Sequence, residues 1–237
     1  LNRARVERGL PQVDSMVDFI KTIPDLSLAL FPDWFAAPQP DWPQPLYQAG
    51  FALYDPDPNV APGAGLRAFL DAGAPPVVFT PGTGNRQARA YFEAAAQATR
   101  ELGLRAVFLT PHVAQLPATL APDICWQDYV PLKALLPHVA ALVHHGGIGT
   151  TAEALRAGTP QLVVPLAHDQ FDNAARVVAM GAGASLQAAR VTPARMAAAL
   201  RKVVGNTQVA AQGARLAARF AGQGGVDGLC ARLETLA

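Results

Sequence analysis

The sequence predicts an α/β protein built on a doubly wound, parallel sheet of six strands. Three observations support this fold class. Short apolar runs alternate with helical patterns from residue 75 onwards, glycine-rich turns follow the first and fourth runs, and 51% of the 237 residues are hydrophobic. Strands that alternate with helices form a parallel sheet that is covered on both faces. We therefore expect a Rossmann-like sheet of order 3-2-1-4-5-6, with a ligand site between strands one and four.

Composition narrows the classes of function. Charged residues make up only 16% of the chain and the formal net charge is +1, so no nucleic acid partner is expected. Cys125 and Cys230 form neither a disulfide framework nor a zinc pattern, which fits a cytoplasmic protein. No apolar run approaches the ~18 residues of a membrane helix, and no signal peptide is recognisable. Leu1 replaces an initiating Met, so we expect an upstream region.

The chain before the sheet is predicted to form two segments. Residues 1–31 contain helical patterns near 2–8 and 11–22 and a short apolar strand at 26–30, and we interpret them as a remnant of an upstream domain. Residues 32–74 are expected to form an ordered strap, because eight of the 21 prolines fall between 32 and 62 and favour extended backbone. The strap's aromatic residues indicate that it packs on a surface: Trp34, Phe35, Trp42, Tyr47, Phe51 and Tyr54.

Residues 75–237 are predicted to form the Rossmann-like domain. Helices are expected to end at glycines, and Thr192 followed by Pro193 is a good helix start. Helical segments continue to the end of the chain, with breaks at Gly205, Gly222 and Gly224. The predicted strands are 76–80, 106–109, 124–126, 140–143, 161–164 and 183–186, and the predicted helices between them are 87–102, 131–136, 150–157 and 170–180.

Two glycine-rich turns carry the clearest functional signal. One spans 81–85 after the first strand, and the other spans 145–151 after the fourth strand. Glycine allows a close approach of the backbone to a ligand, and the N–H groups at the start of a helix attract anions. In the expected strand order the two turns are neighbours. The sequence therefore predicts one shared phosphate or diphosphate site.

The second turn leaves alternatives open. Gly147 to Ala152 match the loose pattern G-x-G-x-x-A, which is also found in tight turns without a ligand. Asp169 lies ~20 residues further on, at the spacing of a ribose-binding acid in NAD-dependent oxidoreductases. However, it follows Pro165 in a loop, and the glycine turn follows the fourth strand instead of the first. An NAD-dependent oxidoreductase is therefore the alternative interpretation.

The polar residues around this turn also allow two interpretations each. His144 and His145 have no third ligand at metal-site spacing, so His145 is expected either to donate to a phosphate or to bond the backbone. Glu153 either stabilises the helix start or binds ribose hydroxyls. The Asp169–Gln170 pair suits sugar hydroxyls or a helix cap. Tyr129, like Trp126, either stacks on a base or belongs to the core.

Together these residues resemble a known family. They are similar to the donor-binding signature of the UDP-glycosyltransferase superfamily, and most similar to bacterial members such as rhamnosyltransferases, sterol glucosyltransferases and antibiotic glycosyltransferases. The matching stretches are Tyr129-Val130-Pro131, Leu135-Leu136-Pro137, His144-His145-Gly146-Gly147-Ile148-Gly149-Thr150-Thr151-Ala152-Glu153-Ala154-Leu155, Gly158-Thr159-Pro160-Gln161, Pro165 and Asp169-Gln170. The resemblance implies that the chain is the C-terminal, donor-binding half of a GT-B fold, which has two Rossmann-like domains.

The resemblance also implies roles for individual residues. Tyr129 and Val130 would bind the base, Glu153 the ribose, and Asp169 with Gln170 the sugar. The diphosphate would be held by Gly82, Thr83, His145, Gly147, Gly149, Thr150 and Thr151.

The implied reaction is inverting, metal-independent transfer of a hexose from a UDP- or dTDP-sugar to an acceptor hydroxyl. The nucleotide sugar is a substrate, so no cofactor is expected. The resemblance implies a basic histidine in the N-terminal domain, and no catalytic residue is assigned in this chain. That domain would also bind most of a small lipidic, polyketide-like or sterol-like acceptor, which allows peripheral membrane association of the full-length protein. A GT-B-type sugar-nucleotide epimerase is a further alternative.

Overall fold

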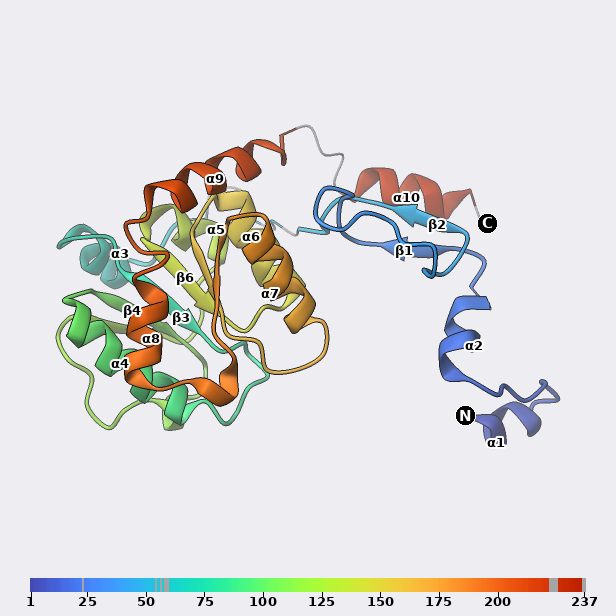
Figure 1. The fold of residues 1–237 in the computed structure, drawn as a ribbon, viewed down its shortest axis with the longest axis horizontal. Coiled ribbons are helices and arrows are strands. Elements are labelled where there is room, and N and C mark those ends of the chain that lie inside the picture. Colours follow the sequence, from blue (N-terminus) through green and yellow to red (C-terminus); the bar gives the residue numbers. More distant parts are fainter. Residues whose placement is uncertain (23, 54, 56, 58–59, 222–225, 236–237) are drawn as a thin grey trace. The chain divides into compact units, whose positions relative to one another are not determined.

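The computed structural model describes residues 1–22, 24–53, 55, 57, 60–221 and 226–235. The chain divides into two compact units, one formed by Leu1–Ala52 with Gly224–Ala237 and the other by Leu53–Gln223. The larger unit contains the sheet (Figure 1). These boundaries differ from those predicted at residues 31 and 74, and the end of the chain belongs to the smaller unit instead of the Rossmann-like domain.

The six-stranded sheet of the larger unit is parallel throughout, with strand order β5-β4-β3-β6-β7-β8. This order confirms the predicted doubly wound topology. The register pairs Thr80 with His144, so the carboxyl ends of β3 and β6 are adjacent. The strands are β3 Val77–Thr80, β4 Ala106–Leu109, β5 Ile124–Gln127, β6 Ala141–His144, β7 Gln161–Val163 and β8 Gly183–Ser185.

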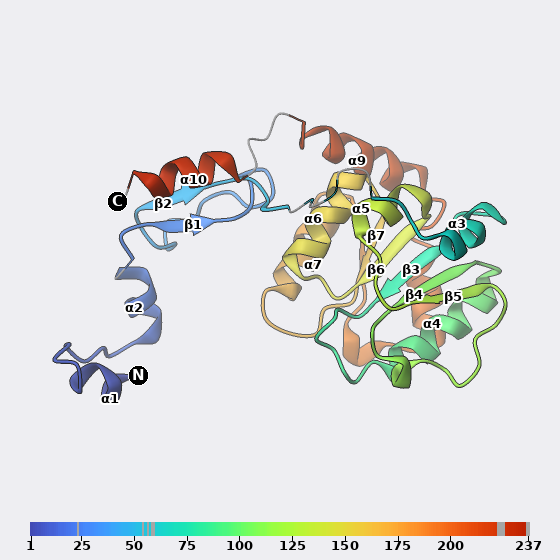
Figure 2. The ribbon, with the colours of Figure 1, turned by 180° about the vertical axis from the view of Figure 1, so that it is seen from behind.

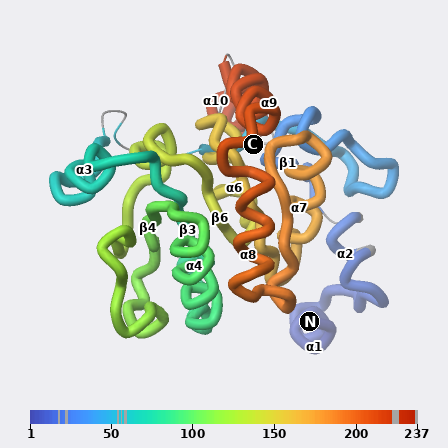
Figure 3. Tube along the Cα trace, turned by 60° about the vertical axis from the view of Figure 1, so that its left-hand side comes forward, coloured from blue at the N-terminus to red at the C-terminus, as the bar shows by residue number. Residues whose placement is uncertain are grey.

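One face of the sheet is covered by α4 (Arg89–Leu102) and α8 (Pro193–Leu200), which lie side by side (Figure 3). Gly103 ends α4 in a left-handed conformation, and the Thr192 hydroxyl accepts a hydrogen bond from the Arg195 N–H at 3.3 Å. Both helix boundaries are as the sequence predicts.

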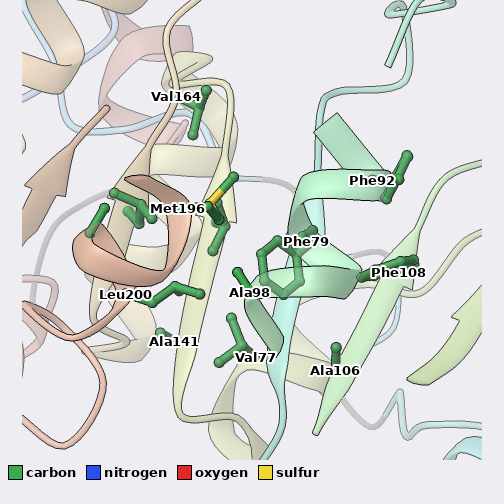
Figure 4. Close-up of a cluster of buried hydrophobic side chains, with 14 of the residues drawn as sticks. Val77, Phe79, Phe92, Ala98, Ala106, Phe108, Ala141, Val164, Met196 and Leu200 are labelled. Atoms are coloured by element: carbon green, nitrogen blue, oxygen red, sulfur yellow. The ribbon is translucent and has the colours of Figure 1, made fainter. Parts of the chain in front are cut away.

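Aromatic side chains fill the space between this helical layer and the sheet. Phe108 lies 5.6 Å from Phe79 and 5.0 Å from Phe92, measured between ring centroids. Figure 4 shows these rings together with Met196 and Leu200 from α8. All five side chains are fully buried, and each contributes roughly 1.5–3 kcal/mol of transfer free energy.

The opposite face is covered by α3 (Ala64–Asp71), α5 (Leu132–Leu135) and α6 (Ile148–Ala157), as Figure 2 shows. Helix α7 (Gln170–Ala179) follows β7 and contacts α6. Helix α3 was not predicted, although it lies within the 32–74 strap. It packs Leu66 and Leu70 onto the sheet.

Helix α9 (Thr207–Ala218) packs against α6 through two glycines. Gly158 ends α6 with a φ of +68°, and a Cβ atom added to Gly213 would lie 2.4 Å from the Gly158 carbonyl oxygen. No side chain larger than hydrogen fits at Gly213 without moving one of the two helices. The described part of the larger unit also contains short 3₁₀ turns at Val113–Gln115, Leu136–His138 and Ala188–Arg190.

The smaller unit contains α1 (Asn2–Val6), α2 (Met16–Thr22), the parallel pair β1 (Ser27–Ala29) and β2 (Leu46–Gln48), and α10 (Asp227–Glu234). Figures 1 and 2 show α10 beside β1 and β2. Aromatic side chains of the proline-rich segment contact one another and Phe31. Trp42 lies 5.8 Å from Phe31, and Phe51 lies 5.2 Å from Phe35. Tyr54 and the glycines at 222 and 224 lie outside the described residues.

Candidate functional site

A pocket of about 930 Å³ opens at the carboxyl ends of β3 and β6. Both glycine-rich turns contribute to its wall, as the predicted topology requires. The lining residues that the sequence singled out are Gly82, Thr83, Tyr129, Val130, His145, Gly147, Gly149, Thr150 and Gln170. Asn85, from the first predicted turn, also lines the pocket, and residues that sequence reasoning missed include Gln87, Asp128, Leu132, Leu166 and His168.

The His145 ring lies against glycines of both turns. A Cβ atom added to Gly82 would lie 2.9 Å from its Cε1 atom, and one added to Gly147 would lie 2.6 Å from its Nε2 atom. Both distances are well below van der Waals contact. Gly82 also has a φ of +90°, which disfavours other residues. The two turns therefore need glycine here, because any larger residue would displace the imidazole.

Burial lowers the pKa of His145, and the carboxylate of Asp169 partly opposes this effect. The Nδ1 atom is buried and has no hydrogen-bond partner among the described residues. Burial thus favours the neutral ring in the free protein. An anion bound nearby would favour the protonated ring.

The N-terminus of α6 faces the same pocket. Gly147 is the residue before the helix, and its carbonyl accepts the first helical hydrogen bond, from the Thr151 N–H at 2.9 Å. The N–H groups of residues 148–150 come before that bond, so they have no acceptor within the helix. Thr151 itself is buried, and its hydroxyl donates to the Gly147 carbonyl at 3.0 Å. Its side chain therefore stabilises the turn from behind the pocket wall.

His144 is fully buried and holds the turn together. Its Nδ1 accepts from the Gly146 N–H at 3.1 Å, so its Nε2 must donate to Oε1 of Gln161 at 3.0 Å. Burial, with a smaller effect from His145, lowers its pKa to about 3. The described residues contain no group of three metal-ligating side chains that would include these histidines.

Tyr129 and Trp126 differ in how freely they can meet a ligand. Tyr129 lines the pocket with 71% of its surface exposed, and Val130 is buried beside it. Trp126 does not line the pocket, and its Nε1 donates to the Thr110 carbonyl at 2.9 Å. Of the two aromatic residues, Tyr129 is therefore placed to stack on a planar ligand.

Glu153 lies one helical turn beyond the pocket wall, where its carboxylate pairs with Arg156 at 2.6 Å. Burial raises the pKa of Glu153, and Arg156 opposes that rise. Arg156 also pairs with Asp55 at 2.6 Å, and Lys133 pairs with Asp55 at 3.1 Å. The assignment of Glu153 to ribose stays a prediction.

The two residues predicted to bind sugar are both held by neighbours. Gln170 lines the pocket, and its Oε1 accepts from the Leu166 and Ala167 N–H groups at 2.9 and 3.1 Å. This leaves its amide nitrogen for a ligand. Asp169 is exposed and immediately precedes α7, but its side chain caps no helix N–H group.

Asn173 connects Asp169 to the glycine turn. Its buried amide nitrogen donates to the Gly146 carbonyl at 2.9 Å and to Oδ2 of Asp169 at 2.8 Å. Sequence reasoning missed this residue, and its spacing of one turn from Asp169 was the only available signal. The backbone of the other turn has a similar support, because the His112 Nε2 donates to the Thr83 carbonyl at 3.1 Å.

The doubly wound sheet and the pocket at its switch point define the C-terminal half of a GT-B glycosyltransferase fold. The chain belongs to the family described as erythromycin biosynthesis protein CIII-like, C-terminal domain, whose model matches residues 106–236. It is 36% identical over 202 residues to O-mycaminosyltylonolide 6-deoxyallosyltransferase of Streptomyces fradiae. The matched region covers 83% of this chain and 46% of that protein. The chain thus spans about half the length of this relative.

Solved structures agree with this assignment. The glycotransferase of kitacinnamycin superposes with a TM-score of 0.79 at 27% identity, over 99% of this chain and 60% of that one. The glycosyltransferase VinC, solved in complex with dTDP, gives a TM-score of 0.66 at 27% identity, over 88% of this chain and 51% of that one.

Among the described residues, none of the helices is long and apolar enough to cross a membrane.

Proposed function

We propose that this chain is the donor-binding part of a glycosyltransferase and that it binds a UDP- or dTDP-hexose in the pocket between β3 and β6. The observation that carries this proposal is the placement of His145 between Gly82 and Gly147, where two turns and the start of α6 meet. Helix N–H groups and a histidine that gains charge near an anion suit a diphosphate. VinC, which was solved with dTDP, supports this class of ligand.

The ligand would extend from Tyr129 to Gln170 along the pocket. Tyr129 follows β5 and is exposed for stacking on the base, Thr83 and Thr150 lie at the two turns, and Gln170 follows β7, which lies on the other side of β3 and β6 in the sheet. Stacking on an aromatic ring and hydrogen bonds to hydroxyl groups suit the two ends of a nucleotide sugar. Asp169 and Glu153 are proposed to complete the sugar and ribose contacts.

The proposed reaction is a direct displacement at the anomeric carbon, with inversion and without a metal. The bond from this carbon to the diphosphate oxygen breaks as the acceptor oxygen forms its own bond, and the acceptor proton goes to a base. Negative charge develops on the departing diphosphate, where the α6 N–H groups and His145 stabilise it. We assign the base, and most of the site for a lipidic, polyketide-like or sterol-like acceptor, to protein outside this chain.

A thermal-shift panel of UDP, dTDP, GDP and NAD tests the proposal. A ligand at 100 times its Kd stabilises the protein by ~2.7 kcal/mol, so UDP or dTDP should raise the Tm of the larger unit by several degrees. NAD should have no effect. A shift with NAD and none with UDP or dTDP would favour the oxidoreductase alternative and refute the proposal.

Turnover separates the glycosyltransferase from the epimerase. The chain should bind UDP or dTDP without transferring sugar, because the proposed base lies elsewhere. When a second protein supplies the N-terminal half, we expect free UDP to be released from a UDP-hexose and a glycosylated product to form. A change of sugar configuration without an acceptor would favour the epimerase.

A further inference from the structure

Four charged side chains gather beside the pocket, outside its wall. Asp55 comes from the chain segment before α3, Lys133 from α5, and Glu153 and Arg156 from α6. Arg156 and Glu153 keep only 22% and 17% of their side-chain surface exposed. Ion pairs at this degree of burial are screened less than surface pairs.

The position of Glu153 relates this cluster to the pocket. Residues three and four apart share one face of a helix. Glu153 therefore lies on the face that begins with Gly149 and Thr150, both of which line the pocket. Arg156 is three residues further along the same helix and bonds only Oε2 of Glu153, at 2.6 Å. Among the described residues no hydrogen bond occupies Oε1, so one carboxylate oxygen of Glu153 is available to a ligand.

Arg156 is itself held in a fixed orientation. Its Nη1 and Nη2 donate to the two carboxylate oxygens of Asp55 at 2.6 and 3.0 Å, while the same Nη2 donates to Glu153. A bidentate pair of this kind fixes the plane of the guanidinium group. Lys133 Nζ contacts Oδ2 of Asp55, the oxygen that also accepts from Arg156 Nη1, at 3.1 Å. Each link of the chain Lys133–Asp55–Arg156–Glu153 is thus a charged contact with a defined geometry.

We propose that Arg156, clamped by Asp55, is a positioning residue that holds the Glu153 carboxylate ready for the ribose hydroxyls of the donor. Without Arg156, the partly buried carboxylate would lose its only charged partner on α6 and turn toward solvent. The segment that carries Asp55 then contributes to nucleotide affinity without touching the nucleotide. This inference rests on the proposed function.

Calorimetric titration with UDP and with pyrophosphate tests the inference, because only UDP carries ribose. Arg156→Met should weaken UDP binding about tenfold, in the range of coupled neighbours, and change pyrophosphate binding less than about twofold. Asp55→Asn should reproduce part of the UDP loss. Lys202→Met, at an exposed site after α8, is the matched control for removal of a charge and should leave both ligands unaffected.

A double-mutant cycle shows whether Arg156 acts through Glu153. In a Glu153→Gln background, Arg156→Met should add less than about a twofold loss of UDP affinity. Additive losses, or equal losses for UDP and pyrophosphate, would overturn the inference and leave the proposed function intact. A wild-type chain that binds neither UDP nor dTDP would overturn both. Urea unfolding of each variant checks that the larger unit stays folded under the titration conditions.

Discussion

The buried His144 makes the stability of the larger unit depend on pH. Its pKa falls from 6.5 to about 3 on folding, because burial disfavours the charged ring. Between these values the unfolded chain binds a proton that the folded chain does not, so stability falls as the pH is lowered. Each pH unit in this window removes ~1.4 kcal/mol. From pH 7.5 to pH 4.5, His144 alone should lower the free energy of unfolding by about 2–3 kcal/mol.

The substitution His144→Asn removes this titration. An asparagine oxygen can still accept from the Gly146 N–H group, while the bond to Gln161 is lost. At pH 7.5 the variant should be less stable by about 1–3 kcal/mol, the effect of a buried group left without its partner. As the pH falls to 4.5, the stability difference between wild type and variant should shrink by about 2–3 kcal/mol. Contributions from other titrating groups, such as Asp55 and Glu153, largely cancel in this difference.

Urea unfolding at several pH values measures the difference. Trp126 is the one tryptophan of the larger unit, so replacement of Trp34 and Trp42 by Phe makes fluorescence report on that unit alone. Equal m-values for wild type and variant indicate comparable two-state transitions. A stability difference that stays constant between pH 7.5 and 4.5 would refute the buried, neutral His144 described above.

Three further predictions concern the same turn. His145→Ala should weaken UDP or dTDP binding by about 1.5–3 kcal/mol in calorimetry, because a charged hydrogen bond is lost; an unchanged Kd would contradict its assignment to the diphosphate. In urea unfolding, Gly147→Ala should lower the free energy of unfolding by about 1–3 kcal/mol, because the added methyl group clashes with the His145 ring. The control is Gly149→Ala, whose added methyl group meets nothing within 4 Å. It should be neutral or stabilising by up to ~1 kcal/mol. Asn173→Leu should cost about 1–3 kcal/mol in the same assay, because the Gly146 carbonyl loses its donor; an unchanged midpoint would show that water replaces the amide.

The sheet was predictable because its signals are local. Buried apolar strands such as 106–109, with glycine or proline at the ends of the elements, fix where the backbone turns, and the alternation of strands and helices leaves few topologies. Strand order then placed Gly82 and His145 in one pocket. The fold class and the shared site both follow from information within short windows of sequence.

The parts that were missed depend on contacts between distant residues. Helix α3 lies in a proline-rich region, and only its burial of Leu66 and Leu70 against the sheet explains it. Helix α10 lies in the same compact unit as β1 and β2, although almost the whole length of the sequence separates it from them. The pairing of Asp55 with Arg156 spans 101 residues, and no spacing rule could reveal it. Each of these features is decided by tertiary packing, which overrides local patterns.

The contact between Gly158 and Gly213 limits how this fold can be recombined. When sequences are exchanged between related enzymes to make chimaeras, a crossover placed between α6 and α9 separates two positions that share one space. A parent with alanine at either position would place a methyl group against the backbone at the other position. Productive junctions should therefore fall before residue 158 or after residue 213, so that both glycines come from one parent.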